Sequence, residues 1–192
     1  MNILKCIAAA LVAVLLSTPA QAALLLGTQG SGANLVTDYS ASGLVSFNLE
    51  MGDASHVSLR YEIEEADLAG PLGLSAMILN MRGVPFSQFN FAVNGITFMN
   101  TAGSVTPAFG SVGDVGASAS LVHIGFAAAE PAEFNFGNPL RDAGLNDWLL
   151  DTAGLRAGDV FTVTAFVPEP SSVALMLPLL AGLVAARRRS KR

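Results

Sequence analysis

Large apolar side chains recur at every second position in the central part of the chain. The pattern runs through residues 45–49, 57–63 and 89–93, with polar or small residues between the apolar ones. A period of two puts alternate side chains on opposite faces of a strand, so each segment should bury one face and expose the other. Further segments expected to form strands are 96–98, 120–126 and 160–167. The central region is therefore predicted to be mainly β.

Turn residues separate several of these strands. Residues 52–55 have the length of a hairpin turn, and Asn94-Gly95 is the dipeptide most typical of a tight hairpin. Residues 103–116 are rich in glycine, serine and valine, so they are expected to form a long loop.

One segment departs from this alternation. Leu145, Trp148 and Leu149 have helical spacing, which predicts one short helix within residues 141–152. Several short strands joined by polar turns, with a single helix, favour an antiparallel β-sandwich or jelly-roll formed by residues 23–167.

Residues 1–22 have the three parts of a secretory signal peptide. A lysine near the start precedes the apolar run 7–16, and Pro19 then interrupts it before Ala20-Gln21-Ala22. As a helix the run would be about 15 Å long, half of the roughly 30 Å hydrocarbon core of a bilayer. We therefore expect signal peptidase to read Ala20 and Ala22 and to cleave after Ala22. The alternative is a buried N-terminal helix.

The C-terminal region, residues 168–192, begins with Pro168-Glu169-Pro170, whose two prolines cannot continue a central strand. An uncharged apolar stretch follows, and a membrane-spanning helix is expected at about 172–186.

Positive charge ends the chain. Residues 187–192 include Arg187, Arg188 and Arg189, and such clusters stay on the cytoplasmic side of a membrane. Long arginine side chains can also reach the interface from a helix that is short for the bilayer. The predicted topology places residues 23–167 outside the cytoplasm and the C-terminus inside.

These three C-terminal parts resemble the PEP-CTERM sorting signal of Gram-negative bacteria. Pro168, Glu169 and Pro170 match its motif, and the apolar helix and arginine tail follow in the same order. The resemblance implies processing by an exosortase near the motif, from an inner-membrane precursor to the cell surface or the extracellular matrix. The alternative is a single-pass anchor that is never cut.

Charge and cysteine content narrow the possible functions of residues 23–167. This region has four arginines against fourteen acidic residues, a net charge of −10. Such a field repels a phosphate backbone, so nucleic acid is not expected as a partner. The only cysteine is Cys6, in the predicted signal peptide, so neither a disulfide nor a thiolate site is expected in the mature protein.

Acidic residues are densest at Glu62, Glu64, Glu65 and Asp67, and a solvated strand face explains this run best. Calcium favours clustered carboxylate oxygens. If the protein holds calcium, the expected ligands are Asp53, Glu64 and Asp67.

Catalytic motifs are not evident. His56 and His123 lack the spacing of a metalloprotease motif, and the chain has no Gly-x-Ser-x-Gly nucleophile elbow. We therefore expect neither an enzyme nor a cofactor. A pair of glycosidase carboxylates stays open as an alternative, since any two acidic residues could meet in space.

Aromatic residues offer one further possibility. Trp148 with Phe134, Phe136 and Tyr61 could form a platform for stacking sugars, although Trp148 is better explained as a core residue. The sequence thus favours an exported, non-enzymatic structural or interaction protein of the cell surface or exopolysaccharide matrix. A carbohydrate-binding module and, after it, a secreted hydrolase are the alternatives.

Overall fold

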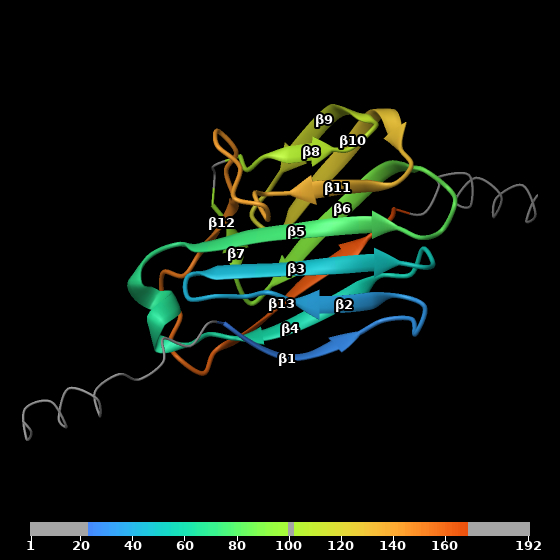
Figure 1. Cartoon of the computed structure of the whole chain (residues 1–192). Helices are drawn as coiled ribbons and strands as arrows, with labels where there is room; N and C mark the ends of the chain where they lie inside the picture. The colour runs from blue at the N-terminus through green and yellow to red at the C-terminus, as the bar shows by residue number, and fades with distance from the viewer. Residues whose placement is uncertain (1–22, 100–101, 169–192) are drawn as a thin grey trace, which may run out of the picture.

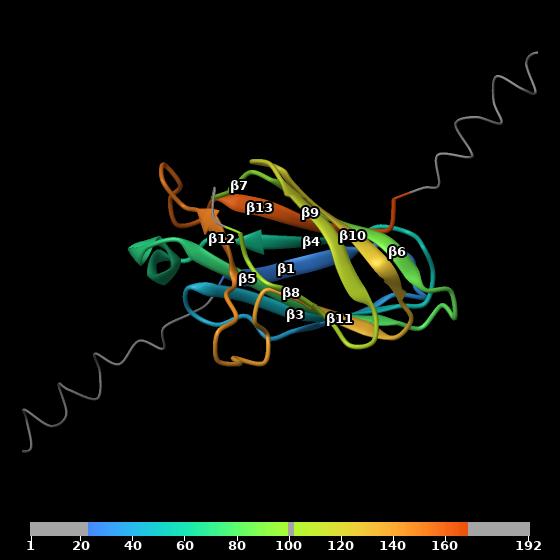
Figure 2. The ribbon, with the colours of Figure 1, turned by 90° about the horizontal axis from the view of Figure 1, so that it is seen from above.

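Strands form most of the described part of the chain, which is residues 23–99 and 102–168 of the computed structural model. They make two mostly antiparallel sheets, which lie one in front of the other in Figure 1 and appear as two layers in Figure 2. The prediction of a mainly β protein is confirmed. In chain order the elements are β1 (Leu24–Gln29), β2 (Leu35–Asp38), β3 (Leu44–Met51), β4 (Val57–Glu62), the 3-10 helix η1 (Glu65–Ala69), β5 (Leu72–Asn80), β6 (Phe86–Asn94), β7 (Thr97–Phe98), β8 (Val105–Pro107), β9 (Ser111–Ala117), β10 (Leu121–Glu130), β11 (Glu133–Phe136), β12 (Trp148–Asp151) and β13 (Val160–Phe166).

The first sheet has the order β1-β4-β13-β6-β10-β9, and all of its neighbours are antiparallel. The second sheet has the order β2-β3-β5-β11-β8, with β3 and β5 parallel. Two short strands share one edge of β5: β11 pairs with its second half and β12 with its first half, and β7 pairs with β12 in turn.

The prediction of a hairpin turn at residues 52–55 is wrong, because β3 and β4 lie in different sheets. Both strands are buried on one face, and a connection that crosses between the layers sets those two apolar faces against each other. Since β4 leaves the second sheet, the chain returns through η1 to form β5 parallel to β3.

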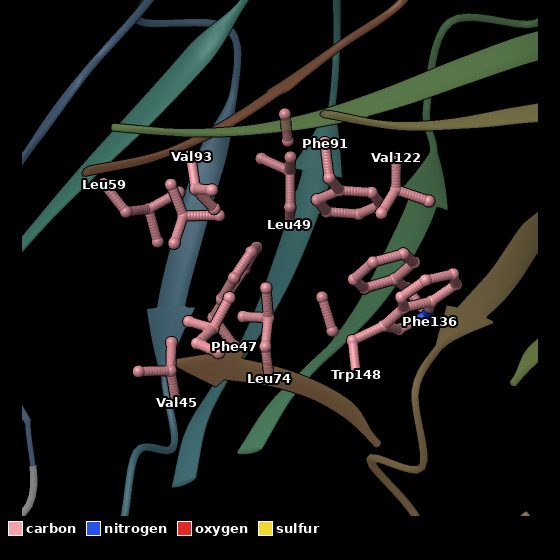
Figure 3. Close-up of a cluster of buried hydrophobic side chains, with 14 of the residues drawn as sticks. Val45, Phe47, Leu49, Leu59, Leu74, Phe91, Val93, Val122, Phe136 and Trp148 are labelled. Atoms are coloured by element: carbon pink, nitrogen blue, oxygen red, sulfur yellow. The ribbon is translucent and has the colours of Figure 1, made fainter. Parts of the chain in front are cut away.

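Aromatic rings join the two layers at the centre of the core. Phe91 of the first sheet stacks on Phe136 of the second with ring centroids 3.9 Å apart, and Phe136 stacks on Trp148 at 5.0 Å. Figure 3 shows these rings among aliphatic side chains such as Leu49 and Val122, which come from both sheets. Burying a side chain of this size contributes about 1.5–3 kcal/mol, so these contacts hold the layers together.

The helix predicted within residues 141–152 is also wrong. Residues 148–151 form β12, in which Trp148 and Leu150 are buried while Leu149 between them is only half-buried. The side chain of Asn138 donates to the carbonyls of Asp142 and Leu145, and accepts from the Asp142 amide. These bonds hold the preceding residues in a loop and compete with the backbone pairing of a helix.

The prediction that residues 103–116 form one long loop is wrong, because these residues contain β8 and most of β9. β9 is an edge strand with mostly exposed side chains, so no apolar alternation marks it. One of its glycines allows a close approach, because a Cβ on Gly113 would lie 3.0 Å from the amide nitrogen of Ala127 on β10.

The turn predicted at Asn94-Gly95 is confirmed, with Gly95 at φ +83°. The strand that follows, β7, does not fold back along β6 but pairs with β12 in the other sheet. A side chain at position 95 would also meet the carbonyl oxygen of Val160, 2.7 Å from its Cβ.

Register places the two described chain ends at opposite ends of the layers. β1 and β13 flank β4, and both begin opposite Glu62 and run toward Val57. We call these the Glu62 end, where β1 and β13 begin, and the Pro168 end, where β13 finishes.

The predicted signal peptide, residues 1–22, and the predicted membrane helix at about 172–186 lie outside the described residues. Within residues 23–99 and 102–168, no helix is long and apolar enough to cross a membrane.

Candidate functional site

The aromatic platform proposed for sugar stacking is buried. Trp148, Phe136 and Tyr61 are 0% exposed and Phe134 is 1% exposed, so no face of these rings can meet a ligand. The Trp148 indole instead donates to the carbonyl of Ser104 at 3.3 Å. The interpretation of Trp148 as a core residue is confirmed.

Asp53 orders the connection from β3 to β4. Its carboxylate accepts from the Asn34 amide at 3.0 Å and from the backbone amide and the hydroxyl of Ser55. Hydrogen bonds from Ser31 and Ser55 lower the pKa of Asp53 to about 2. The carboxylate is therefore ionised near neutral pH and ties the β1–β2 loop to the β3–β4 connection.

Asp67 is buried within η1 and serves the backbone. It accepts from the amides of Gly43 and Glu64, each at 3.0 Å, and so fixes the approach to β3 and the start of η1. Asp53 follows β3 whereas Asp67 contacts the residue before it, which separates them by roughly 25 Å along the strand. Glu64 is the residue before η1, three positions ahead of Asp67, so it lies equally far from Asp53 and the three calcium candidates do not come together. No group of three or more His, Cys, Asp or Glu in residues 23–99 and 102–168 is arranged to hold a metal ion.

The two histidines occupy different places. His56 is exposed just before β4. His123 on β10 faces its cross-strand partner Asn90, with its Nδ1 2.7 Å from the Asn90 Oδ1. On its other side the His123 Nε2 lies 3.9 Å from a carboxylate oxygen of Asp114 on β9. The three side chains form a polar row across three neighbouring strands.

Glu130 is a buried acid that no sequence pattern marks. It is 0% exposed, and its two carboxylate oxygens accept four backbone amides, those of Phe109 and Gly110 in the β8–β9 turn and of Ala132 and Glu133 after β10. Burial alone would raise the pKa of Glu130, but these four donors outweigh it and leave the pKa below the usual range. The carboxylate therefore fixes two turns to each other.

A shallow groove of about 280 Å³ lies on the outer face of the second sheet. Its lining residues include Asn48 of β3, Tyr39 after β2 and Arg141 in the loop before β12. The Tyr39 side chain is 58% exposed. Arg141 has φ 59°, the one non-glycine residue with positive φ in the described part of the chain. An exposed ring, an amide and a guanidinium around one hollow can stack on and hydrogen-bond a polar ring-shaped ligand.

A second hollow, of about 260 Å³, lies on the outer face of the first sheet beside β1, where the register shifts between Leu25 and Gly27. Arg60 and Thr162 are among its lining residues, and none of the residues that line it is aromatic.

The predicted processing residues lie mostly outside the described residues. Pro168 is half-buried and lies two residues after the end of β13. Ala20, Ala22, Glu169 and Pro170 fall in the parts that are not described, as do Arg187, Arg188 and Arg189. Compared with known protein families, curated proteins and solved structures, the chain has no match.

Proposed function

We propose that this chain is an exported protein that an exosortase sorts to the cell surface or extracellular matrix of a Gram-negative bacterium, where it has a non-enzymatic structural or interaction role. The observation that carries the proposal is the order Pro168-Glu169-Pro170, apolar stretch and arginine cluster at the end of the sequence. The motif would be a substrate tag for the exosortase.

The position of the fold is consistent with two cuts that leave it intact. β1 begins at Leu24, two residues after the expected signal peptidase site at Ala22, and β13 ends at Phe166, two residues before Pro168. Cleavage at either site would remove no strand. The two facing sheets would then remain as one exported domain.

Replacing Pro168, Glu169 and Pro170 with alanine tests the sorting step. We expect an uncut precursor that accumulates in the inner membrane, whereas wild-type protein matures to a smaller form on a gel. Ser171→Ala with Ser172→Ala is the control, since it changes neighbouring residues and keeps the motif. Normal maturation of the triple variant would count against sorting.

The groove supports a second candidate, carbohydrate binding. Tyr39 supplies an exposed ring for stacking on a sugar face, and Asn48 and Arg141 supply hydrogen-bonding groups beside it. This site differs from the buried aromatic cluster around Trp148, and it is formed by residues far apart in the sequence.

Tyr39→Ala tests this second candidate. Truncating the ring removes a stacking contact of about 1–1.5 kcal/mol, so retardation in a gel containing the producing cell's polysaccharide should weaken about tenfold. Phe109→Ala is the matched control, because Phe109 is also an exposed aromatic residue but lies away from the groove. Equal retardation of wild type and Tyr39→Ala would exclude the groove as the binding site.

A further inference from the structure

Exposed apolar side chains collect at the Pro168 end. Six large apolar residues in the described part of the chain are more than half exposed, and four of them lie at this end. Those four, with their exposed fractions, are Leu35 (58%), Met81 (63%), Val84 (57%) and Phe109 (76%).

Strand register and hydrogen bonds place the first three residues at the same end. Leu35 pairs with Glu50 near the end of β3, and the Met81 amide bonds to the carbonyl of Met51, the last residue of β3. Val84 lies in the β5–β6 connection, just before the start of β6. β13 runs antiparallel to β6 and approaches this start, with Phe166 opposite Asn90. Figures 1 and 2 both show the β5–β6 connection and the finish of β13 on the right of the molecule.

Phe109 is held at this end by Glu130. The Glu130 backbone pairs with Phe86, the first residue of β6, and its carboxylate accepts the amides of Phe109 and Gly110. The most exposed of the large apolar side chains thus projects from a turn whose backbone is fixed. A fixed turn loses little conformational entropy when its side chain is buried in another phase.

Acidic residues are more numerous at the Glu62 end, opposite the exposed apolar side chains. Four carboxylates lie toward the Pro168 end, those of Glu50, Asp53, Glu133 and the buried Glu130, and Arg82 sits there between Met81 and Val84. The Glu62 end carries more carboxylates, with Arg156 beside them in the turn before β13, and its acidic residues are Glu62, Glu64, Glu65, Asp67, Asp147, Asp151 and Asp159. An anionic membrane surface would repel the Glu62 end more strongly.

We infer that the Pro168 end rests on the membrane surface in the uncut precursor, with Val84, Phe109 and their apolar neighbours inserted among the lipid headgroups. The inference depends on the proposed sorting function, because that function places a membrane helix a few residues after Pro168. Apolar loop tips around the point where the chain enters the bilayer bury their surface in the interface. They also orient the domain so that its Pro168 end faces the membrane and its Glu62 end points away from the lipid.

The test uses the precursor purified from membranes of cells that lack the exosortase. Cys6→Ser removes the only native cysteine. A single cysteine then carries an environment-sensitive fluorophore at Val84→Cys or Phe109→Cys, with Ala153→Cys as the control, since Ala153 is exposed and follows β12 at the Glu62 end. The protein is reconstituted in phosphatidylcholine and phosphatidylglycerol vesicles with and without brominated acyl chains. Emission from the buried Trp148 checks the fold of each variant, and Met81→Cys replaces any variant that fails this check.

We expect probes at positions 84 and 109 to emit at shorter wavelength in vesicles and to be quenched by brominated lipid at least threefold more than the probe at 153. Equal quenching at all three positions, in protein that floats with the vesicles, would overturn the inference but would still support the proposed membrane helix. Protein that does not float with the vesicles would refute both the proposed membrane helix and this inference. A blue shift that persists in detergent and grows with protein concentration would assign this end to a second copy of the chain instead.

Discussion

Replacing Glu130 with glutamine tests how a buried carboxylate can stabilise this fold. The four amides that it accepts lie 2.8 to 3.1 Å from its oxygens. Glutamine keeps one acceptor oxygen, and its NH2 group would face two backbone N–H donors instead of accepting from them. The exchange conserves shape, so its effect reports on hydrogen bonding.

The expected loss follows from those contacts. Two amides lose their partner, each at about 1–3 kcal/mol, and the other two exchange a charged acceptor for a neutral one. Relief from burying a charge offsets part of this loss. Because the turns are only part-buried, we expect a net destabilisation of about 2–4 kcal/mol, a sizeable fraction of the 5–15 kcal/mol typical of a domain.

Urea unfolding at pH 7 measures the loss, with the fluorescence of Trp148, the only tryptophan, as the signal. With a slope of about 2 kcal/mol per molar, the midpoint of Glu130→Gln should fall by about 1–2 M. Glu133→Gln is the control. It removes the same charge three residues away, and its side chain makes no hydrogen bond within the described residues, so its midpoint should change by less than about 0.25 M.

The pKa of Glu130 adds a dependence on pH. Its folded value lies below the unfolded value of about 4.3, so the stabilisation is complete above that value and is lost as the pH falls through the folded pKa. The gap between wild type and Glu130→Gln should therefore narrow as the pH is lowered below about 5. A gap that is absent at pH 7, or that stays constant on acidification, would refute this account of the four amides.

Two further substitutions test the packing. Phe136→Ala should lower the free energy of unfolding by about 3–5 kcal/mol because it removes the ring between Phe91 and Trp148, whereas exposed Phe109→Ala should change it by less than about 0.5 kcal/mol; thermal unfolding of both variants decides. Gly52→Ala should destabilise by about 1–3 kcal/mol because its Cβ would overlap the carbonyl oxygen of Ala33, whereas Gly27→Ala, with open space around position 27, should not; equal urea midpoints would show that the β1–β2 loop yields without strain.

Strands with one buried face could be predicted from the sequence, and strands in other settings could not. β3, β4 and β13 alternate because one face meets the core and the other meets solvent. β5 lies between β3 and the β11/β12 pair with both faces largely covered, so residues 72–76 are all buried and show no alternation. β9 could not be predicted for the opposite reason, since it is an edge strand whose side chains are mostly exposed and therefore do not alternate.

Pairing and sites depend on contacts between distant residues. The alternation in β3 and β4 fits a hairpin as well as a crossing between layers, so the short connection at residues 52–55 did not decide between them. Helical spacing at Leu145, Trp148 and Leu149 coincided with a strand because Asn138 holds the loop before it. Glu130 and the groove beside Tyr39 likewise required turns and loops that only the folded chain brings together.

The Pro168 end would act in the membrane-bound precursor, and the groove would bind polysaccharide. Because the two surfaces lie apart, substitutions can test them separately. The groove lies on the outer face of the second sheet and includes Leu44, the first residue of β3, so it opens toward the half of the molecule that would point away from the membrane. The acidic residues gathered at the Glu62 end would repel an acidic polysaccharide from that half of the molecule, which favours a neutral polysaccharide as the ligand despite the guanidinium of Arg141. Tyr39→Ala should therefore weaken retention by a neutral polysaccharide without changing lipid quenching at position 109. A probe at Phe109→Cys should leave that retention unchanged. If either substitution altered both polysaccharide retention and lipid quenching, a single surface would bind both ligands. The assignment of the groove to sugar and of the Pro168 end to lipid would then be wrong.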